Sequence, residues 1–169
     1  RLSLHNLTVD TAQQALESVI SVITQQLKDL EKAMRQLVKV LMPELLDELG
    51  IGPVHAATLL AETGDPRCFR SQYSFALYAG CAPVERSSGG QQPRQLNIGG
   101  NRILNRTFHL IGQVRLRYDP DSQTYLAKKK KEGKTTRAAL PCLKTVIARD
   151  VFRFMLANAQ QHPERWLRA

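Results

Sequence analysis

The sequence predicts an all-α protein of 169 residues, and three observations support this class. Apolar residues recur at helical spacing over residues 16–41, 101–118 and 135–156. No segment shows a convincing alternation of apolar and polar residues, which is typical of a half-buried strand. Glycine and proline residues lie between the periodic segments, as expected for helix boundaries. With 43% hydrophobic residues, the chain is long enough to bury a core and is expected to be ordered.

The first predicted helix carries a narrow apolar stripe, called the heptad stripe below. Its positions alternate in steps of four and three residues: Leu16, Ile20, Ile23, Leu27, Leu30, Met34, Leu37 and Leu41. Asp10 or Thr11 is expected to cap the start of this helix, and Pro43 to end it. The stripe requires a partner helix, either from a second copy in a homodimer or from elsewhere in the chain. We therefore expect a coiled-coil or dimerisation helix over residues 1–43 and a helical domain over residues 44–169.

Residues 45–64 resemble a helix-hairpin-helix motif, in which two short helices flank a Gly-apolar-Gly turn. The turn is Gly50-Ile51-Gly52, and Pro53 suits the first turn of the second helix. Gly50 and Gly52 permit a tight turn and close approach of another backbone, and the free N–H groups that follow can bind a phosphate. Such a contact binds the nucleic-acid backbone without reading its sequence. The alternative is an ordinary helix pair without a ligand, since few basic residues lie nearby.

Residues 80–100 are predicted to form a long loop, after a short helix over residues 71–78. The loop is rich in Gly, Ser and Gln without periodicity, and loops of this length are commonly functional. Two serines and four arginines in or just after it suit phosphate chemistry: Ser87, Ser88, Arg86, Arg94, Arg102 and Arg106. A serine hydroxyl needs activation to act as a nucleophile, and guanidinium groups would stabilise the charge that develops in phosphoryl transfer. On chemistry alone, however, a serine beside a glycine is usually a turn residue.

A further helix is predicted over residues 101–118. Arg102, Arg106 and His109 share one of its faces, and an apolar face is expected to point inward: Ile103, Leu104, Phe108, Ile111 and Val114. Residues 119–122 break this helix and cap the next one, which is expected from Gln123 to about Glu132.

Four consecutive lysines lie near the end of the helix predicted from Gln123 to about Glu132, and Gly133 is expected to stop this helix: Lys128, Lys129, Lys130 and Lys131. Lysines suit the negative end of a helix dipole and also suit nucleic-acid phosphates. The last helix is expected to begin at Thr135 or Thr136 and to bury one apolar face: Ala138, Ala139, Leu143, Val146, Ile147, Val151, Phe152, Met155 and Leu156.

Positive charge is concentrated in the C-terminal half of the chain. The sequence has 24 Lys and Arg against 15 Asp and Glu, a net charge of +9. Residues 1–84 hold 7 basic and 9 acidic side chains, whereas residues 85–169 hold 17 basic and 6 acidic ones. A half this basic is expected to bind a polyanion, and its many arginines favour nucleic acid over an acidic membrane. The alternative is a solvated basic face without a partner.

Several classes of protein are excluded by missing features. No apolar stretch reaches the ~18–20 residues that a membrane span requires. Cys68, Cys81 and Cys142 form no CxxC pair, so we expect reduced thiols and an intracellular protein. The histidines are scattered, and no P-loop, GxGxxG or HExxH motif is present, so no metal or nucleotide site is predicted. No secretory signal follows Arg1. Because the chain begins with Arg1 and not with Met, we expect a processed chain or a fragment of a longer protein.

Seven short motifs occur in an order that resembles one protein family: Gly-Ile-Gly-Pro (50–53), Leu-Leu-Ala-Glu-Thr-Gly-Asp (59–65), Phe-Arg-Ser (69–71), Tyr-Ala-Gly-Cys-Ala-Pro (78–83), Ser-Ser-Gly (87–89), Gly-Asn-Arg (100–102) and Tyr-Asp-Pro (118–120). Over residues 45–157 the chain resembles the C-terminal half of the insertion sequence 110/116/902 transposases. It departs from the family pattern at Cys81, where leucine is usual, and at Ile103, where a second arginine is usual. The heptad helix is similar to the coiled coil of that family.

The resemblance implies RNA-guided DNA recombination in a bacterial, cytoplasmic and nucleoid-associated protein. It implies Ser88 as the nucleophile, with Ser87 as the second choice, and DNA and a guide (bridge) RNA as partners. The Mg²⁺ ligands of the family belong to an acidic RuvC-like domain that precedes the coiled coil, so no cofactor is expected in this fragment. Phosphate contacts are expected from Gly50, Gly52, Arg86, Arg94, Arg102, Arg106 and Lys128 to Lys131.

Two other functions remain open at this stage. One is a non-catalytic helix-hairpin-helix module that only grips DNA. The other is a coiled-coil scaffold whose basic half binds partner proteins.

Overall fold

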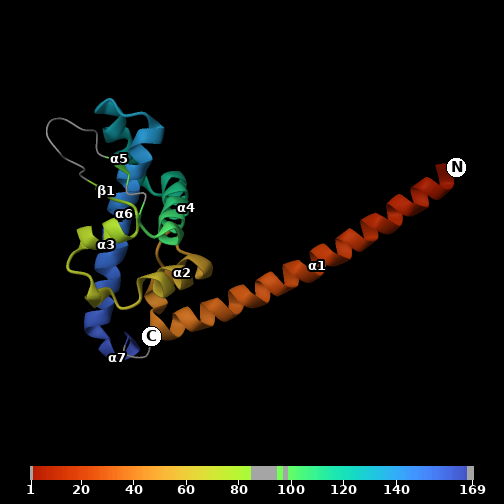
Figure 1. Cartoon of the computed structure of the whole chain (residues 1–169), viewed down its shortest axis with the longest axis horizontal. Helices are drawn as coiled ribbons and strands as arrows, with labels where there is room; N and C mark the ends of the chain where they lie inside the picture. The colour runs from red at the N-terminus through yellow and green to blue at the C-terminus, as the bar shows by residue number, and fades with distance from the viewer. Residues whose placement is uncertain (1, 85–94, 97–98, 167–169) are drawn as a thin grey trace.

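The computed structural model describes residues 2–84, 95–96 and 99–166, and it confirms the all-α class (Figure 1). The helices, with two 3-10 turns marked η, follow in this order: α1 (Leu2–Leu41), η1 (Pro43–Leu46), α2 (Pro53–Thr63), η2 (Pro66–Cys68), α3 (Gln72–Tyr78), α4 (Arg102–Tyr118), α5 (Pro120–Lys131), α6 (Thr136–Gln161) and α7 (Pro163–Trp166). The described chain also contains one short antiparallel pair that the sequence did not predict: β1 (Pro83–Val84) and β2 (Gln95–Leu96). No described helix is long and apolar enough to cross a membrane.

α1 projects from the other helices as one long helix, and it begins earlier than predicted (Figure 1). It starts at Leu2 rather than at a cap formed by Asp10 or Thr11, so the predicted cap was wrong. The physical reason is that neither Gly nor Pro occurs between Leu2 and Asp10, so nothing stops the helix from continuing. The other end agrees with the prediction, since α1 ends at Leu41 just before Pro43.

The heptad stripe of α1 is exposed along most of its length. Six of its residues leave between 49% and 66% of their surface accessible to solvent: Leu16, Ile20, Ile23, Leu27, Leu30 and Leu37. Only the end of α1 joins the domain, where Val38 and the following Met42 are buried in the core. No described segment covers these six residues, so the described chain supplies no partner helix for them, and only Leu41 at the end of the stripe packs against the core.

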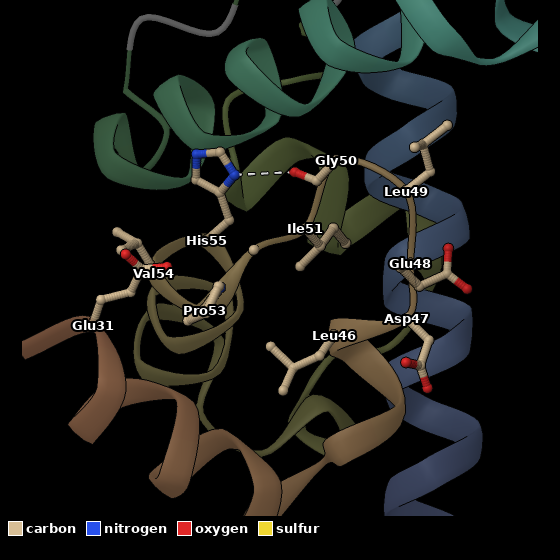
Figure 2. A pocket seen from close by; sticks show the side chains of 11 residues that line it. Glu31, Leu46, Asp47, Glu48, Leu49, Gly50, Ile51, Pro53, Val54 and His55 are labelled. Carbon is tan, nitrogen blue, oxygen red and sulfur yellow. Dashed lines mark hydrogen bonds between the residues drawn. The ribbon is translucent and has the colours of Figure 1, made fainter. Parts of the chain in front are cut away.

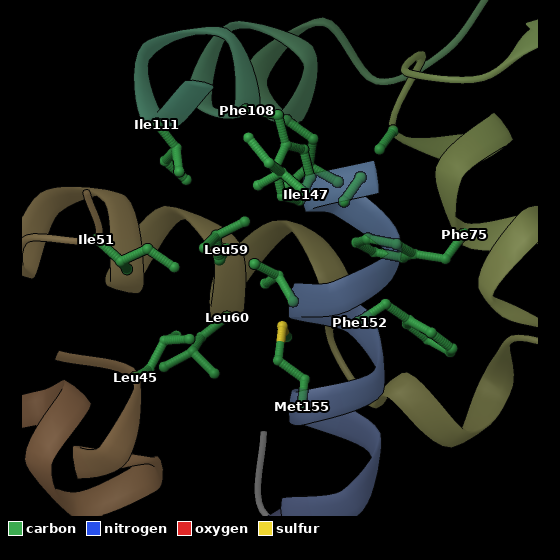
Figure 3. Close-up of a cluster of buried hydrophobic side chains, with 14 of the residues drawn as sticks. Leu45, Ile51, Leu59, Leu60, Phe75, Phe108, Ile111, Ile147, Phe152 and Met155 are labelled. Atoms are coloured by element: carbon green, nitrogen blue, oxygen red, sulfur yellow. The ribbon is translucent and has the colours of Figure 1, made fainter. Parts of the chain in front are cut away.

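The core of the domain forms around α6, which packs against α3, α4 and α5. Figure 3 shows buried side chains of this core. One face of α6 is buried, largely as predicted: Ala139, Leu143, Ile147, Val151, Phe152 and Met155. Phe152 stacks on Phe75 of α3 with ring centroids 4.9 Å apart, and Phe75 contacts Phe108 of α4 edge to face. Aromatic rings contribute most to such a core because each removes a large apolar area from water. α6 thereby joins the other helices into one core.

Side-chain caps set the starts of several helices, among them α4, α5 and α6. Asn101 accepts hydrogen bonds from the first turn of α4, Asp119 from the first turn of α5, and Thr135 from the first turn of α6. α5 begins at Pro120 and not at Gln123 as predicted, because the Asp119 carboxylate accepts from the backbone N–H groups of the two residues after the proline.

The predicted inward face of α4 needs one correction. Leu104, Phe108 and Ile111 are buried as predicted, but Ile103 is 53% exposed. The reason is that successive residues of a helix point about 100° apart, so Ile103 points away from the core when Leu104 points into it.

Ala138, predicted in the core face of α6, is also exposed. Gly133 follows α5 with a left-handed φ of +85°, which confirms it as the stop of that helix.

Two glycines hold the ends of the loop between α3 and α4 together. Gly80 has a left-handed φ of +65°, and a Cβ added to Gly100 would lie 2.4 Å from the Cα of Gly80. Backbones approach this closely only where both residues lack a side chain. Beside this contact, the N–H of Asn101 donates to the carbonyl oxygen of Tyr78 at 2.6 Å. The chain therefore enters and leaves the loop at a single point of the domain.

Gly100→Ala is expected to lower the free energy of unfolding by roughly 1–3 kcal/mol, because its Cβ would overlap backbone atoms of Gly80. Gly52→Ala is the matched control, because a Cβ there meets nothing within 4 Å. Glycine is a better N-cap residue than alanine, so this variant is expected to lose about 1 kcal/mol or less. Denaturant unfolding of the 169-residue chain, followed by circular dichroism, measures both variants. Equal stability of the two would contradict a structural role for the Gly80–Gly100 contact.

Candidate functional site

The predicted serine loop lies partly outside the described residues. Ser88, Ser87, Arg86 and Arg94 are all in that part, so their predicted roles stay predictions. The structure describes both ends of the loop, where the two-residue strands pair and where Gly80 meets Gly100. These ends fix where the loop is attached.

Polar side chains of α4 and α6 hold the first end of this loop. Asn105 Nδ2 donates to the carbonyl oxygen of Gly80 at 2.6 Å, and Thr145 Oγ1 donates to the carbonyl oxygen of Cys81 at 2.6 Å. Lys144 Nζ in turn donates to Oδ1 of Asn105. Each bond joins residues far apart in the sequence, so together they fix the loop end to two helices.

Lys144 is a buried cation, with 8% of its surface exposed. Burial lowers the pKa of its ammonium group, because removal from water disfavours the charged form. No described carboxylate forms an ion pair with it. The nearby Cys81 thiol is also buried, which raises its pKa to about 11. Cys81 is therefore a protonated thiol at neutral pH and a poor nucleophile.

Lys144 and Asn105 were not predicted as site residues from the sequence. Lys144 lies four residues after Leu140 and three before Ile147, so it occupies the apolar face of α6. A lysine at a position that the helical period assigns to the core was the available signal, since buried lysines are rare and need a partner. Nothing local marked Asn105, whose partners lie 25 and 39 residues away.

Arg102 and Arg106 lie together on the first turns of α4, as predicted. Both are exposed, and both line a groove of about 630 Å³ between α4 and the start of α2. The α2 side of the groove consists of Val54, His55 and Thr58. The structure thus brings the two arginines beside the first turn of the predicted helix-hairpin-helix segment, which precedes them by almost fifty residues.

The two glycines of the hairpin turn differ in their surroundings. Gly50 has a left-handed φ of +85°, and a Cβ there would lie 3.3 Å from the carbonyl oxygen of Ile111, so this residue packs against α4. Gly52 precedes α2, and a Cβ there would meet nothing within 4 Å. His55 Nδ1 lies 3.0 Å from the carbonyl oxygen of Gly50 and closes the turn (Figure 2). Gly52 leaves the start of α2 accessible, whereas Gly50 has a packing role.

Carboxylates border the outer side of the same turn. The pocket in Figure 2 is lined by Glu31 of α1 and by Asp47 and Glu48 of the turn, with no Lys or Arg in its lining. Arg115 of α4 donates to Glu48 at 3.2 Å and to the carbonyl oxygen of Leu49 at 3.0 Å. Among the described residues, no group of three or more His, Cys, Asp or Glu is arranged to hold a metal ion. Negative charge on this side disfavours a phosphate there.

The lysine run at the end of α5 is not uniform. Lys129 forms an ion pair with Glu132 at 2.7 Å and lies over the ring of Tyr125, and Glu132 raises the pKa of this lysine. Lys128, Lys130 and Lys131 are exposed. The run lines neither side of the groove that holds Arg102 and Arg106. Among the described basic residues, the arginine pair of α4 and the lysine run of α5 therefore lie in two separate groups.

Comparison with known proteins identifies the family. Residues 43–127 match the model of the IS116/IS110/IS902 transposase family. The chain is 35% identical over 136 residues to an uncharacterized 43.6 kDa protein of insertion element IS110 from Streptomyces coelicolor, covering 79% of this chain and 34% of that protein. It is 34% identical over 125 residues to a 42 kDa protein of insertion element IS900 from Mycobacterium paratuberculosis, covering 70% and 30%. The chain thus spans about a third of the length of these relatives.

These matches confirm the resemblance carried by the ordered motifs, and the family model covers the chain from η1 into α5, with both ends of the serine loop. The chain belongs to the IS116/IS110/IS902 family of transposases.

Proposed function

We propose that this chain is the part of an insertion-sequence transposase that binds DNA and guide RNA and supplies a serine nucleophile for DNA strand transfer. The observation that carries the proposal is the joining of the loop ends at Gly80 and Gly100, directly before Arg102 and Arg106. A loop attached there begins and ends beside two exposed guanidinium groups, and this supports a phosphate site at the base of the loop. Family membership supports a role in transposition, and the basic C-terminal half supports nucleic acid as the partner.

In the proposed step, Ser88 Oγ attacks a phosphorus atom of the DNA backbone. A serine–phosphate ester forms as the bond from phosphorus to one strand's sugar oxygen breaks. The serine gives up its proton and the departing sugar oxygen takes one up, so the protons balance. Arg102 and Arg106 would donate hydrogen bonds to the non-bridging oxygens, where negative charge increases in the transition state. Arg86 is assigned the same role and Arg94 a contact with nucleic acid, both on the basis of their positions in the loop.

Ser88→Ala in the full-length transposase is expected to abolish both the covalent protein–DNA adduct on nicked substrate and recombination. The expected loss is at least roughly 10³-fold, because the reacting atom itself is removed. Ser87→Ala is the matched control and is expected to keep most activity. DNA affinity should remain nearly unchanged in both variants, since a loop hydroxyl contributes little to binding.

The outcome also separates the proposal from a non-catalytic helix-hairpin-helix module. Robust recombination by the Ser88→Ala enzyme would falsify the nucleophile assignment and favour the module. The 169-residue chain alone is expected to bind DNA but to cleave little of it, since the resemblance assigns the metal ligands of the family to another domain.

We also propose that two copies of the chain pair along the heptad stripe of α1. The stripe remains exposed in the described chain, and an exposed apolar stripe of this length is unfavourable in water unless another helix covers it.

Substitution of both Leu27 and Leu30 by lysine is expected to give a monomer, because each lysine would bury a charge in the apolar interface. Gln25→Lys adds a charge outside the stripe and should leave the dimer intact. Sedimentation at tens of micromolar measures the oligomeric state. If the unsubstituted chain is already monomeric at that concentration, the pairing proposal is wrong.

The exposed lysines of α5 are proposed to contact nucleic-acid phosphates. Joint replacement of Lys128, Lys130 and Lys131 by glutamine should flatten the plot of log affinity against log salt by up to about 0.9 per lost duplex phosphate contact. Lys129→Gln serves as the control and should change the slope less, because Glu132 already neutralises this lysine. An unchanged slope in the triple variant would assign the run to a solvated face.

A further inference from the structure

Two adjoining grooves run along α4, and together they form what we call the α4 trough. The first groove, which holds Arg102 and Arg106, and the second each have a volume of about 630 Å³, and both are lined by His55 and Leu110. The second groove continues to Tyr118 at the end of α4, where Leu140 of α6 borders it. At a rise of 1.5 Å per residue, the trough is about 24 Å long.

The rim of the α4 trough is basic. Arg102 and Arg106 line its first half, and Arg117 lines the second. All three are exposed, and none forms an ion pair with a described carboxylate. No Asp or Glu lines either half. Arg115 of the same helix shows the contrast, since it is bonded to Glu48 outside the trough. The charge of the rim therefore fits a polyanion.

Apolar and aromatic side chains that line the α4 trough, called its floor below, are open to solvent. Ile103, Leu110 and Tyr118 are 53%, 37% and 62% exposed. A basic rim around an apolar and aromatic floor is typical of channels for single-stranded nucleic acid, where arginines hold phosphates and base faces lie on apolar side chains. A duplex keeps its base faces stacked inside, so it would leave this floor uncovered. The combination favours unpaired nucleotides.

His55 adds a hydrogen-bonding group where the two halves of the α4 trough meet. A carbonyl oxygen only accepts hydrogen bonds, so the contact with Gly50 places a proton on Nδ1 of His55 (Figure 2). In the neutral ring, Nε2 is then an acceptor. Such an acceptor can bind an amino or imino group on the edge of an unpaired base, an edge that pairing would occupy.

We propose that the α4 trough binds a short unpaired segment of DNA or RNA, roughly four to seven nucleotides long. The phosphates would bind the arginines of the rim and the bases would lie against the floor. This inference rests on the proposed function, because it names the form of nucleic acid that the same chain binds.

Fluorescence anisotropy with the 169-residue chain tests the proposal. The probes are a labelled 12-nucleotide DNA strand, an RNA strand of the same sequence, and the corresponding DNA duplex, all at one salt concentration. Tyr118→Ala is expected to weaken binding of the preferred single strand about tenfold, through lost base stacking, and to change duplex binding less than twofold. Tyr118→Phe keeps the ring and should bind like the unsubstituted chain. The strand bound more tightly identifies DNA or RNA as the source of the segment.

A pair of arginine variants tests the rim. Arg106→Gln is expected to weaken single-strand binding several-fold. Arg137→Gln is the charge-matched control, because Arg137 is exposed on the first turn of α6 and does not line the trough. Circular dichroism confirms that each variant is folded.

The outcomes separate this inference from the proposed function. If Tyr118→Ala binds the single strand with unchanged affinity, or loses equal affinity for strand and duplex, single-strand binding in the α4 trough is overturned. The Ser88 assignment then still stands. Binding of an acidic peptide, with no nucleic acid bound by the unsubstituted chain, would overturn both the trough and the nucleic-acid role. Selective single-strand binding in a chain whose Ser88→Ala transposase recombines normally would support the trough and reject the nucleophile.

Discussion

Burial of one face of α6 holds the other elements of the domain in place. α3 has 7 residues and α2 has 11, so both are shorter than the ~12–15 residues at which an isolated helix becomes even marginally stable in water. Their helicity depends on packing, through contacts such as the stacked rings of Phe75 and Phe152. α3 and α4 both pack on α6, and this brings Gly80 and Gly100 together. The family match ends at residue 127, within α5. The matched segment therefore cannot bury its own core without the helix that follows it.

Features that depend on neighbouring residues could be predicted from the sequence, whereas contacts between distant residues could not. The starts of α4 and α6 follow from Asn101 and Thr135, whose side chains act within one helical turn. The basic pair on α4 was also predictable from its helical spacing. The α4 trough was not, because its other wall comes from α2, and Ile103 was assigned to the core although it lines that trough. The serine loop was identified by its composition and by resemblance, and the role of Ser88 stays a prediction.

The two sides of the hairpin turn differ in charge, and this has consequences for how a polyanion can approach. Glu31, Asp47 and Glu48 border the side that faces α1, whereas Arg102 and Arg106 line the side that faces α4. The field around the turn therefore attracts phosphates toward α4 and repels them from the junction with α1. The net charge of the chain does not show this difference between the two sides. The difference depends on which arginines are already bound to a carboxylate, as Arg115 is.

The 40 residues of α1 span about 60 Å at 1.5 Å per residue, and the helix joins the core only near its last turns. In a pair of such helices, the relative direction of the two chains determines how far apart their domains lie. Parallel pairing places both domains at the same end. Antiparallel pairing separates them by a length equal to roughly 18 base pairs of duplex at 3.4 Å per pair. The direction of pairing, rather than the chemistry of either domain, would therefore decide how far apart two sites on DNA can be when one dimer holds both.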